Sequence, residues 1–403
     1  MALRTKWMQS GALLIGALAL VTAACGNDKS DNSAANATDK TADMVTAIPS
    51  LSGIGTAVAI DAGTAGALTS LGVALTPSGS ATFDAGTSTI TFPITSGYAE
   101  IHSDVNYKPG YIAGSIQHQG SGISLTAGST KVELSNFVVD PANSMLYGTV
   151  GGAPKVPLLF LDGTAVKVST ERGNVVLQGT VAKLTETAAG ALNGAFKTTA
   201  IKAGMPLGGV RLVAKGQAVT YNAAVDKTTT IARLNGEGTS VKLDAGTAAA
   251  LKSLNVAVAP TGSGTFDAGT GTVTFPITGG FASIHSDPAF QPGYIAGVVL
   301  HEGSGLKFTA GAKSLELTNF VVDPGNSVLT ATAGSTAGIP ILFLDGTAVK
   351  VTPTSTGAIL DGTVAKLTST AADTLNKTFG VTAFKEGIPL GVVHLVATAQ
   401  PAG

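Results

Sequence analysis

The chain of 403 residues is nearly neutral, with 24 Lys and Arg against 25 Asp and Glu, and only 12% of its residues are charged. The sequence has no basic stripe of the kind that binds nucleic acid, and its length favours two domains or more. Its 52 glycines, 5% aromatic content and many Thr, Ala and Val residues are typical of a β-rich exported protein.

Residues 1–24 predict a bacterial signal peptide. Arg4 and Lys6 precede the apolar run GALLIGALALVTAA, which is too short for a comfortable membrane span. The run ends in TAAC, which resembles a lipobox, so we expect Cys25 to carry acyl chains such as palmitate and to anchor an exported protein to a membrane, at the cell surface or the periplasmic face. The alternative is ordinary secretion with an incidental cysteine. Because Cys25 is the only cysteine, an intramolecular disulfide is excluded.

The segment that follows Cys25 predicts a flexible tether. Residues 26–42 read GNDKSDNSAANATDKTA and contain no large apolar side chain. Such a segment buries too little surface to offset the entropy lost on folding. We therefore assign 25–42 to a lipidated cysteine with a disordered tether.

The rest of the chain is a long internal repeat. His102 recurs as His285 and His118 as His301, both at an offset of 183 residues, and LFLDGTAVKV occurs at 159–168 and again at 342–351. A repeat of this length is a whole domain rather than a solenoid unit. We predict tandem domains at 43–215 and 226–400, joined by a linker at 216–225.

The coarse pattern within each repeat is rich in strands. FDAGTSTITFPI, at 83–94, predicts a hairpin with Asp84 in its turn, and KVELSNFVVDP, at 131–141, predicts a strand with Val132, Leu134, Asn136 and Val138 on one face. LDAGTAAALKSL and LTSTAADTLNKTFG predict short helices that begin at small polar residues and follow strands. The predicted fold is mainly β: two tandem sandwich-like domains, each with about two short helices and a strand-helix-strand element at either end.

No motif in the chain indicates an enzyme. His102, Ser103 and Asp104 are consecutive, so along a strand they alternate between faces, whereas catalytic triads are assembled from distant segments. The sequence lacks a nucleophile elbow, a zinc-binding helix and a phosphate-binding loop. Duplicated domains on a tether favour binding or structural work, in which two copies raise avidity.

Four stretches together resemble the HtaA-type domain, a β-rich module of bacterial surface proteins involved in haem capture. They are TFPITSG, GYIAGSIQHQGSGISL, VELSNFVVDP and LTETAAGALNGAF, and the resemblance covers both repeats in order. It implies haem, or a haem protein, as a partner. In the family a tyrosine near the start of the domain ligates the haem iron and a strand histidine assists it. The histidine corresponds to His118 and His301, while both repeats begin without a tyrosine.

Tyr111 and Tyr294 are the nearest tyrosines to these two histidines. Each lies seven residues before its histidine, so the two side chains face opposite sides of an unbroken strand. A bulge at Gly114 or at the equivalent glycine of the second repeat would bring them together.

His118 shares its predicted strand face with Ile112 and Ile116, which indicates an inward-facing imidazole. One interpretation is a buried neutral histidine hydrogen-bonded to a residue such as Asn136 or, in the second repeat, Asn319. The other is a role in a ligand pocket.

His102 and His285 form a second repeated pair, within IHSD, and we predict that Tyr98, Glu100 and His102 share one strand face. A solvated strand end and a ligand are the two interpretations of this pair.

Our functional hypothesis is a membrane-anchored surface lipoprotein whose two domains bind haem or another planar apolar ligand, without catalytic activity and with its oligomeric state left open. The alternative is a structural or adhesive surface module with no small-molecule ligand. The candidate ligand-binding residues are His118, His301, Tyr111, Tyr294, His102 and His285.

Overall fold

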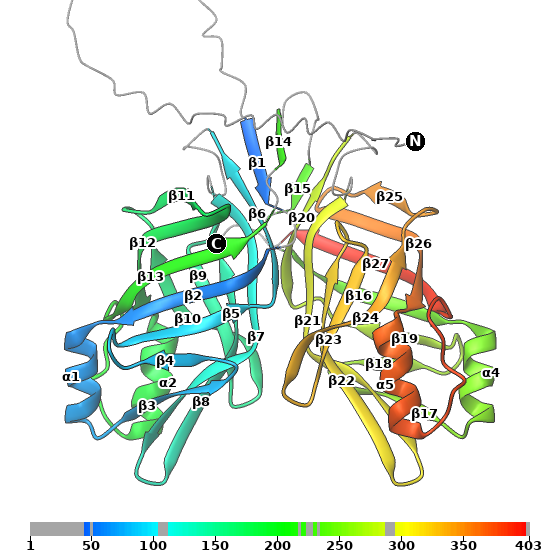
Figure 1. Cartoon of the computed structure of the whole chain (residues 1–403), viewed down its shortest axis with the longest axis horizontal. Helices are drawn as coiled ribbons and strands as arrows, with labels where there is room; N and C mark the ends of the chain where they lie inside the picture. The colour runs from blue at the N-terminus through cyan, green and yellow to red at the C-terminus, as the bar shows by residue number, and fades with distance from the viewer. Residues whose placement is uncertain are drawn as a thin grey trace, which may run out of the picture. The chain divides into compact units, whose positions relative to one another are not determined.

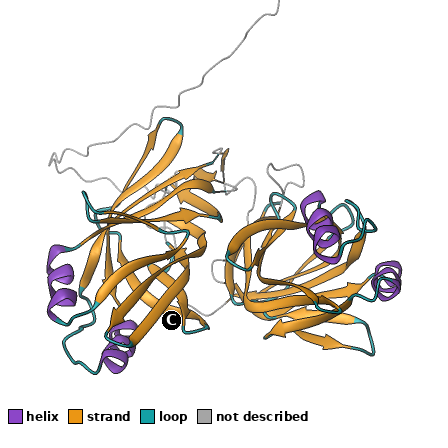
Figure 2. Ribbon diagram, turned by 60° about the horizontal axis from the view of Figure 1, so that its bottom comes forward, coloured by secondary structure: helices purple, strands orange, loops and turns teal. Residues whose placement is uncertain are grey.

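The computed structural model describes residues 44–48, 51–103, 112–216, 219–222, 229–231, 234–286 and 295–399. These residues form two large antiparallel sheets, one in each repeat, together with short helices (Figure 1). Strands make up most of each repeat, and the helices lie at the outside of the strand layers (Figure 2). The predicted fold class, two tandem β-rich domains with two short helices each, is confirmed.

The first repeat begins with a short strand and continues as strand-helix-strand before its long central strands. Its elements are β1 (Met44–Ile48), β2 (Ser52–Ile60), α1 (Ala62–Ser70), β3 (Ala74–Gly79), β4 (Thr82–Asp84), β5 (Thr89–Ile94), β6 (Ser96–His102), β7 (Ile112–Ala127), β8 (Thr130–Asp140), β9 (Met145–Val150), β10 (Ala153–Asp162), β11 (Lys167–Glu171), β12 (Asn174–Leu184), α2 (Glu186–Phe196), β13 (Pro206–Lys215) and β14 (Val219–Asn222).

The second repeat follows the same order. Its elements are β15 (Thr229–Ile231), β16 (Leu234–Leu243), α4 (Ala245–Ser253), β17 (Ala257–Gly262), β18 (Thr265–Asp267), β19 (Thr272–Phe275), β20 (Gly279–Ile284), β21 (Ile295–Ala310), β22 (Lys313–Asp323), β23 (Val328–Ala333), β24 (Thr336–Asp345), β25 (Lys350–Pro353), β26 (Gly357–Leu367), α5 (Ser369–Phe379) and β27 (Pro389–Ala399).

The sheet of the first repeat runs in the order β14-β1-β6-β7-β8-β9-β10-β12-β13-β2-β5-β4, with β11 added to β12 and β3 to β7. The long strand β7 therefore pairs with β6 along its first half and with β3 along its second half, while β8 lies on its other side. Residues 219–222, inside the segment predicted as a linker, form β14 and pair with β1. The second sheet repeats this order from β15 to β18.

Each repeat has its own hydrophobic core, one built from residues 48–214 and the other from residues 231–397. The two predicted helices begin at small polar residues as expected: the Asp244 carboxylate accepts a hydrogen bond from the Thr247 amide at 2.9 Å, and the Thr368 hydroxyl accepts one from the Ala371 amide at 3.1 Å. Asp61 and Thr185 cap the equivalent helices of the first repeat in the same way. Among the described residues, no helix is long and apolar enough to cross a membrane.

The predicted alternation along β8 is wrong beyond Leu134. Asn136 has a left-handed backbone, with φ of 53°, and the pairing of β7 with β8 slips between His118 and Gly122. The slip moves the strand by one position, so Phe137 rather than Val138 faces the interior of the repeat with Leu134. A single bulge therefore reverses the second half of the strand.

Candidate ligand-binding cavities

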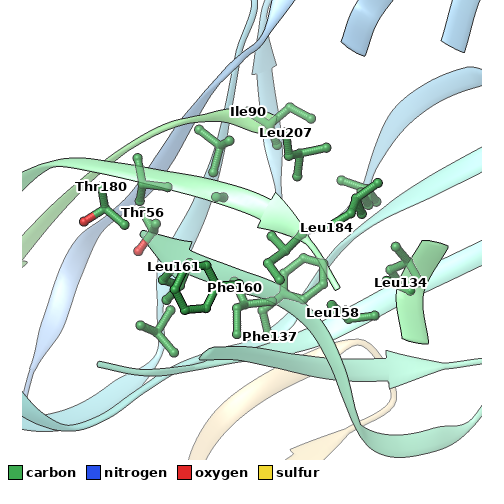
Figure 3. Close-up of a pocket in the computed structure, with 18 of the residues that line it drawn as sticks. Thr56, Ile90, Leu134, Phe137, Leu158, Phe160, Leu161, Thr180, Leu184 and Leu207 are labelled. Atoms are coloured by element: carbon green, nitrogen blue, oxygen red, sulfur yellow. The ribbon is translucent and has the colours of Figure 1, made fainter. Parts of the chain in front are cut away.

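The first repeat encloses an apolar cavity of about 430 Å³. Figure 3 shows its wall, with Phe137, Leu158 and Phe160 beneath the strand that carries Thr180. Alternate residues of a strand share a face, which is why Val58 on β2 faces inward while its sequence neighbours do not. The volume lies in the range of about 300 to 1,000 Å³ that is typical of small-molecule sites.

The second repeat has a cavity of about 580 Å³ at the equivalent place. Its wall repeats the polar and aromatic residues of the first: Thr239, Phe275, His301, Phe320, Phe343 and Thr363 stand where the first repeat has Thr56, Phe92, His118, Phe137, Phe160 and Thr180. The two repeats therefore carry one kind of site twice.

His118 lies in the wall of the first cavity and is 1% exposed. Its Nε2 is 2.7 Å from the Thr56 hydroxyl, and its Nδ1 is 3.3 Å from the Phe137 carbonyl oxygen. Burial lowers the pKa of His118 to about 4, against a smaller opposing effect of the Phe137 carbonyl, so the ring is neutral near pH 7. Because a carbonyl only accepts, Nδ1 carries the proton and Nε2 accepts from Thr56.

His301 repeats the contact with a threonine, because its Nε2 lies 2.7 Å from the Thr239 hydroxyl. Burial likewise lowers its pKa to about 4. The inward orientation expected for both histidines is found, but the expected partners, Asn136 and Asn319, are wrong. The side-chain Oδ1 atoms of Asn136 and Asn319 instead accept hydrogen bonds from the backbone N–H groups of Gly120 and Gly303, and these bonds stabilise the bulge that follows each histidine.

The described lining does not fit a haem whose iron is coordinated by His118. Both ring nitrogens of His118 are engaged, and Nε2, the atom that would meet iron, already accepts a hydrogen bond. Within the described residues, neither cavity is lined by a tyrosine or a cysteine. The His118 imidazole therefore orients the Thr56 hydroxyl in the cavity wall and is not placed to bind iron.

Tyr111, Tyr294 and Cys25 lie outside the described residues. The bulge considered at Gly114 does not occur, because β6 and β7 pair without a break from Ser96 to Ile101. Gly114 instead serves close strand packing: its φ is 133°, and a Cβ there would lie 2.1 Å from the Tyr98 carbonyl oxygen.

His102 and His285 line neither cavity. Tyr98, Glu100 and His102 do share a face, since the Tyr98 hydroxyl donates to Glu100 Oε1 at 2.7 Å and His102 Nε2 lies 3.6 Å from Glu100 Oε2. The expectation of a solvated strand end is wrong, because His102 is 5% exposed and His285 3% exposed. The pair belongs to the packing of the strands.

The outer face of β7 is buried as well. Ala113 and Tyr98 belong to a hydrophobic cluster that also contains Phe281 and Val298 of the second repeat, and the rings of Tyr98 and Phe281 stack with centroids 5.6 Å apart. Both faces of the histidine-bearing strand are therefore covered, one by the cavity and the other by this cluster.

Of the described lining residues, one in each cavity carries a charge. Asp162, the last residue of β10, accepts hydrogen bonds from Lys183 Nζ at 2.7 Å and from Thr164, and these bonds lower its pKa to about 2. Asp345 makes the same contacts with Thr347 and Lys366, and its pKa is also lowered to about 2. Phe160 lines the first cavity and is 44% exposed, so the cavity wall reaches the protein surface at this residue.

Sequence reasoning missed the threonines of the cavity, Thr56 and Thr180 with their counterparts Thr239 and Thr363. The signal that could have found them is that each keeps its identity and register in both repeats, on strands that otherwise carry apolar inward residues.

No protein-family model and no curated protein matches the chain. Among solved structures, the chain is similar to the C-terminal domain of HtaA from Corynebacterium glutamicum, with 13% sequence identity and a TM-score of 0.29. The match covers 42% of this chain and 98% of that domain. A likeness at this level carries no information about what the chain binds.

Proposed function

We propose that this chain is a binding protein with two sites, each of which holds one small apolar molecule in the cavity of one repeat. The observation that carries the proposal is the pair of equivalent apolar cavities, of about 430 and 580 Å³. We further propose that acylation of Cys25 holds the two sites at a membrane surface, a role supported by its place after an apolar run.

A purely structural module would have no use for these spaces. Protein interiors pack as densely as organic crystals and keep few voids larger than a water molecule, because an empty cavity forfeits contacts. A void of this size in an unliganded protein destabilises the fold by several kcal/mol, on the scale measured for engineered cavities. Two such voids at matching positions favour occupancy by a ligand.

A titration with the neutral fluorescent probe N-phenyl-1-naphthylamine tests the proposal. We expect saturation near two equivalents of probe per chain. Thr180 and Thr363 line the two cavities on β-strands, where aromatic residues are common, so Thr180→Phe and Thr363→Phe each place a phenyl ring inside one cavity. We expect this ring to obstruct the probe and to lower the stoichiometry to one in each single variant. The double variant binds none.

The matched controls are Thr82→Phe and Thr265→Phe, which add the same ring at exposed positions outside the cavities. They leave the stoichiometry at two. Probe binding that survives in the double cavity variant, or that is absent from the unmodified protein, contradicts the proposal.

A further inference from the structure

We propose that the ligand of each cavity is electrically neutral, with an apolar body and a hydroxyl or carbonyl group, and that anionic amphiphiles of similar shape are rejected. This inference rests on the proposed function and names the chemical class of its ligand. It follows from the charges and the hydrogen-bonding groups of the cavity walls.

The described walls hold no cation that could pair with an anionic ligand. The titratable side chains among the lining residues are His118 and Asp162 in the first cavity, and His301 and Asp345 in the second. Both histidines are held neutral by burial, so among the described lining residues the only formal charge of each cavity is a carboxylate. An anion entering the space would leave water without gaining a counter-charge.

The lysines that pair with these two carboxylates do not supply a free counter-charge. Lys183 Nζ lies 2.7 Å from Asp162 Oδ2, and Lys366 Nζ lies 2.7 Å from Asp345 Oδ2, so each ammonium is already paired. Neither lysine is among the residues that line a cavity. A ligand carboxylate near Asp162 or Asp345 would have to compete with that aspartate for the lysine that already pairs with it.

The hydroxyl groups of the wall provide a handle for a neutral polar group. Thr56 donates its proton to His118 Nε2, which leaves the oxygen lone pairs of Thr56 free to accept. Thr180 also lines the cavity, and its hydroxyl makes no hydrogen bond with the described part of the chain.

These two threonines flank the same strand. Thr56 is opposite Leu212 of β13, and Thr180 is opposite Val210 of the same strand. Figure 3 shows Leu134, Leu158 and Leu184 away from them in the cavity wall. The wall therefore combines a polar spot of acceptors and donors with an apolar remainder, which suits an alcohol or a ketone on a hydrocarbon frame.

Retinol and retinoate test the inference, because they share one carbon skeleton and differ in charge. We expect the purified full chain at pH 8 to bind retinol at least tenfold more tightly than retinoate. The double variant Asp162→Asn with Asp345→Asn removes the carboxylate charge from both cavity walls. We expect it to lower the ratio of retinol affinity to retinoate affinity several-fold. Glu133→Gln with Glu316→Gln, which removes carboxylates from exposed positions outside the cavities, is the control and keeps the ratio.

A second pair of variants tests the polar spot independently. Thr180→Val with Thr363→Val removes the hydroxyls at nearly constant volume, so we expect the affinity for retinol to fall about fivefold relative to that for N-phenyl-1-naphthylamine. Retinoate binding as tightly as retinol overturns the inference and leaves the proposed function standing. If neither retinoid nor the naphthylamine probe binds, the proposed function fails, and this inference fails with it.

Discussion

The replacement of Glu302 by glutamine should stabilise the protein at alkaline pH. Glu302 follows His301 on β21 and is 6% exposed, and burial raises its pKa from 4.5 to about 7, against an opposing effect of Lys155. Between pH 4.5 and pH 7 the Glu302 carboxyl binds its proton more tightly in the folded chain than in the unfolded chain. Glu302 therefore lowers the stability of the protein as pH rises from 4.5 to 7. At 1.36 kcal/mol per pH unit, the loss amounts to about 3 kcal/mol.

The first repeat supplies the precedent for this change, because Gln119 occupies the equivalent position and its Nε2 lies 3.5 Å from the Asn319 carbonyl oxygen. We therefore expect Glu302→Gln to raise the free energy of unfolding by up to about 3 kcal/mol at pH 8 and by much less at pH 4. Urea unfolding of both proteins at each pH from 4 to 8 measures the difference. A difference that does not vary with pH would refute the reasoning.

Three further outcomes are expected. His118→Ala should lower the stability of the protein without lowering the number of haemin equivalents in a Soret titration, and loss of one equivalent would instead indicate that His118 coordinates the iron. Because burial lowers the pKa of His118 to about 4, this side chain should also make the protein less stable as pH falls from 6.5 to 4. Gly114→Ala should lower the stability of the protein in thermal unfolding by more than about 2 kcal/mol, because the added Cβ would meet backbone atoms. Gly66→Ala in α1 should raise the stability by up to about 1 kcal/mol, since the equivalent residue of the second repeat is already alanine. Equal effects of the two changes on stability would contradict both predictions. Cys25→Ser should abolish labelling by a palmitate analogue and release the protein from membranes, and label retained in this variant would rule out the anchor.

The helices and the inward histidines could be predicted because local signals decide them. Asp61 and Thr185 cap helices through contacts within a single turn. The two-residue period of a strand placed His118 on the same face as Ile116, and no bulge lies between them.

Other features depend on contacts that a strand pattern does not contain. The reversal after Leu134 comes from the left-handed backbone of Asn136, which a reader of the sequence sees only as one polar residue in a strand. The burial of His102 depends on its tertiary surroundings. The cavities were not foreseeable for a similar reason: a period of two marks the inward face, but it does not say whether opposing side chains meet or leave a space between them.

The most direct test of the two-site account is a crystal structure of the protein grown with retinol. The account predicts ligand density in both cavities, with its hydroxyl within hydrogen-bonding distance of Thr56 or Thr180 in the first repeat and of Thr239 or Thr363 in the second. Cavities closed by side chains, or retinol found only on the outer surface, would contradict it.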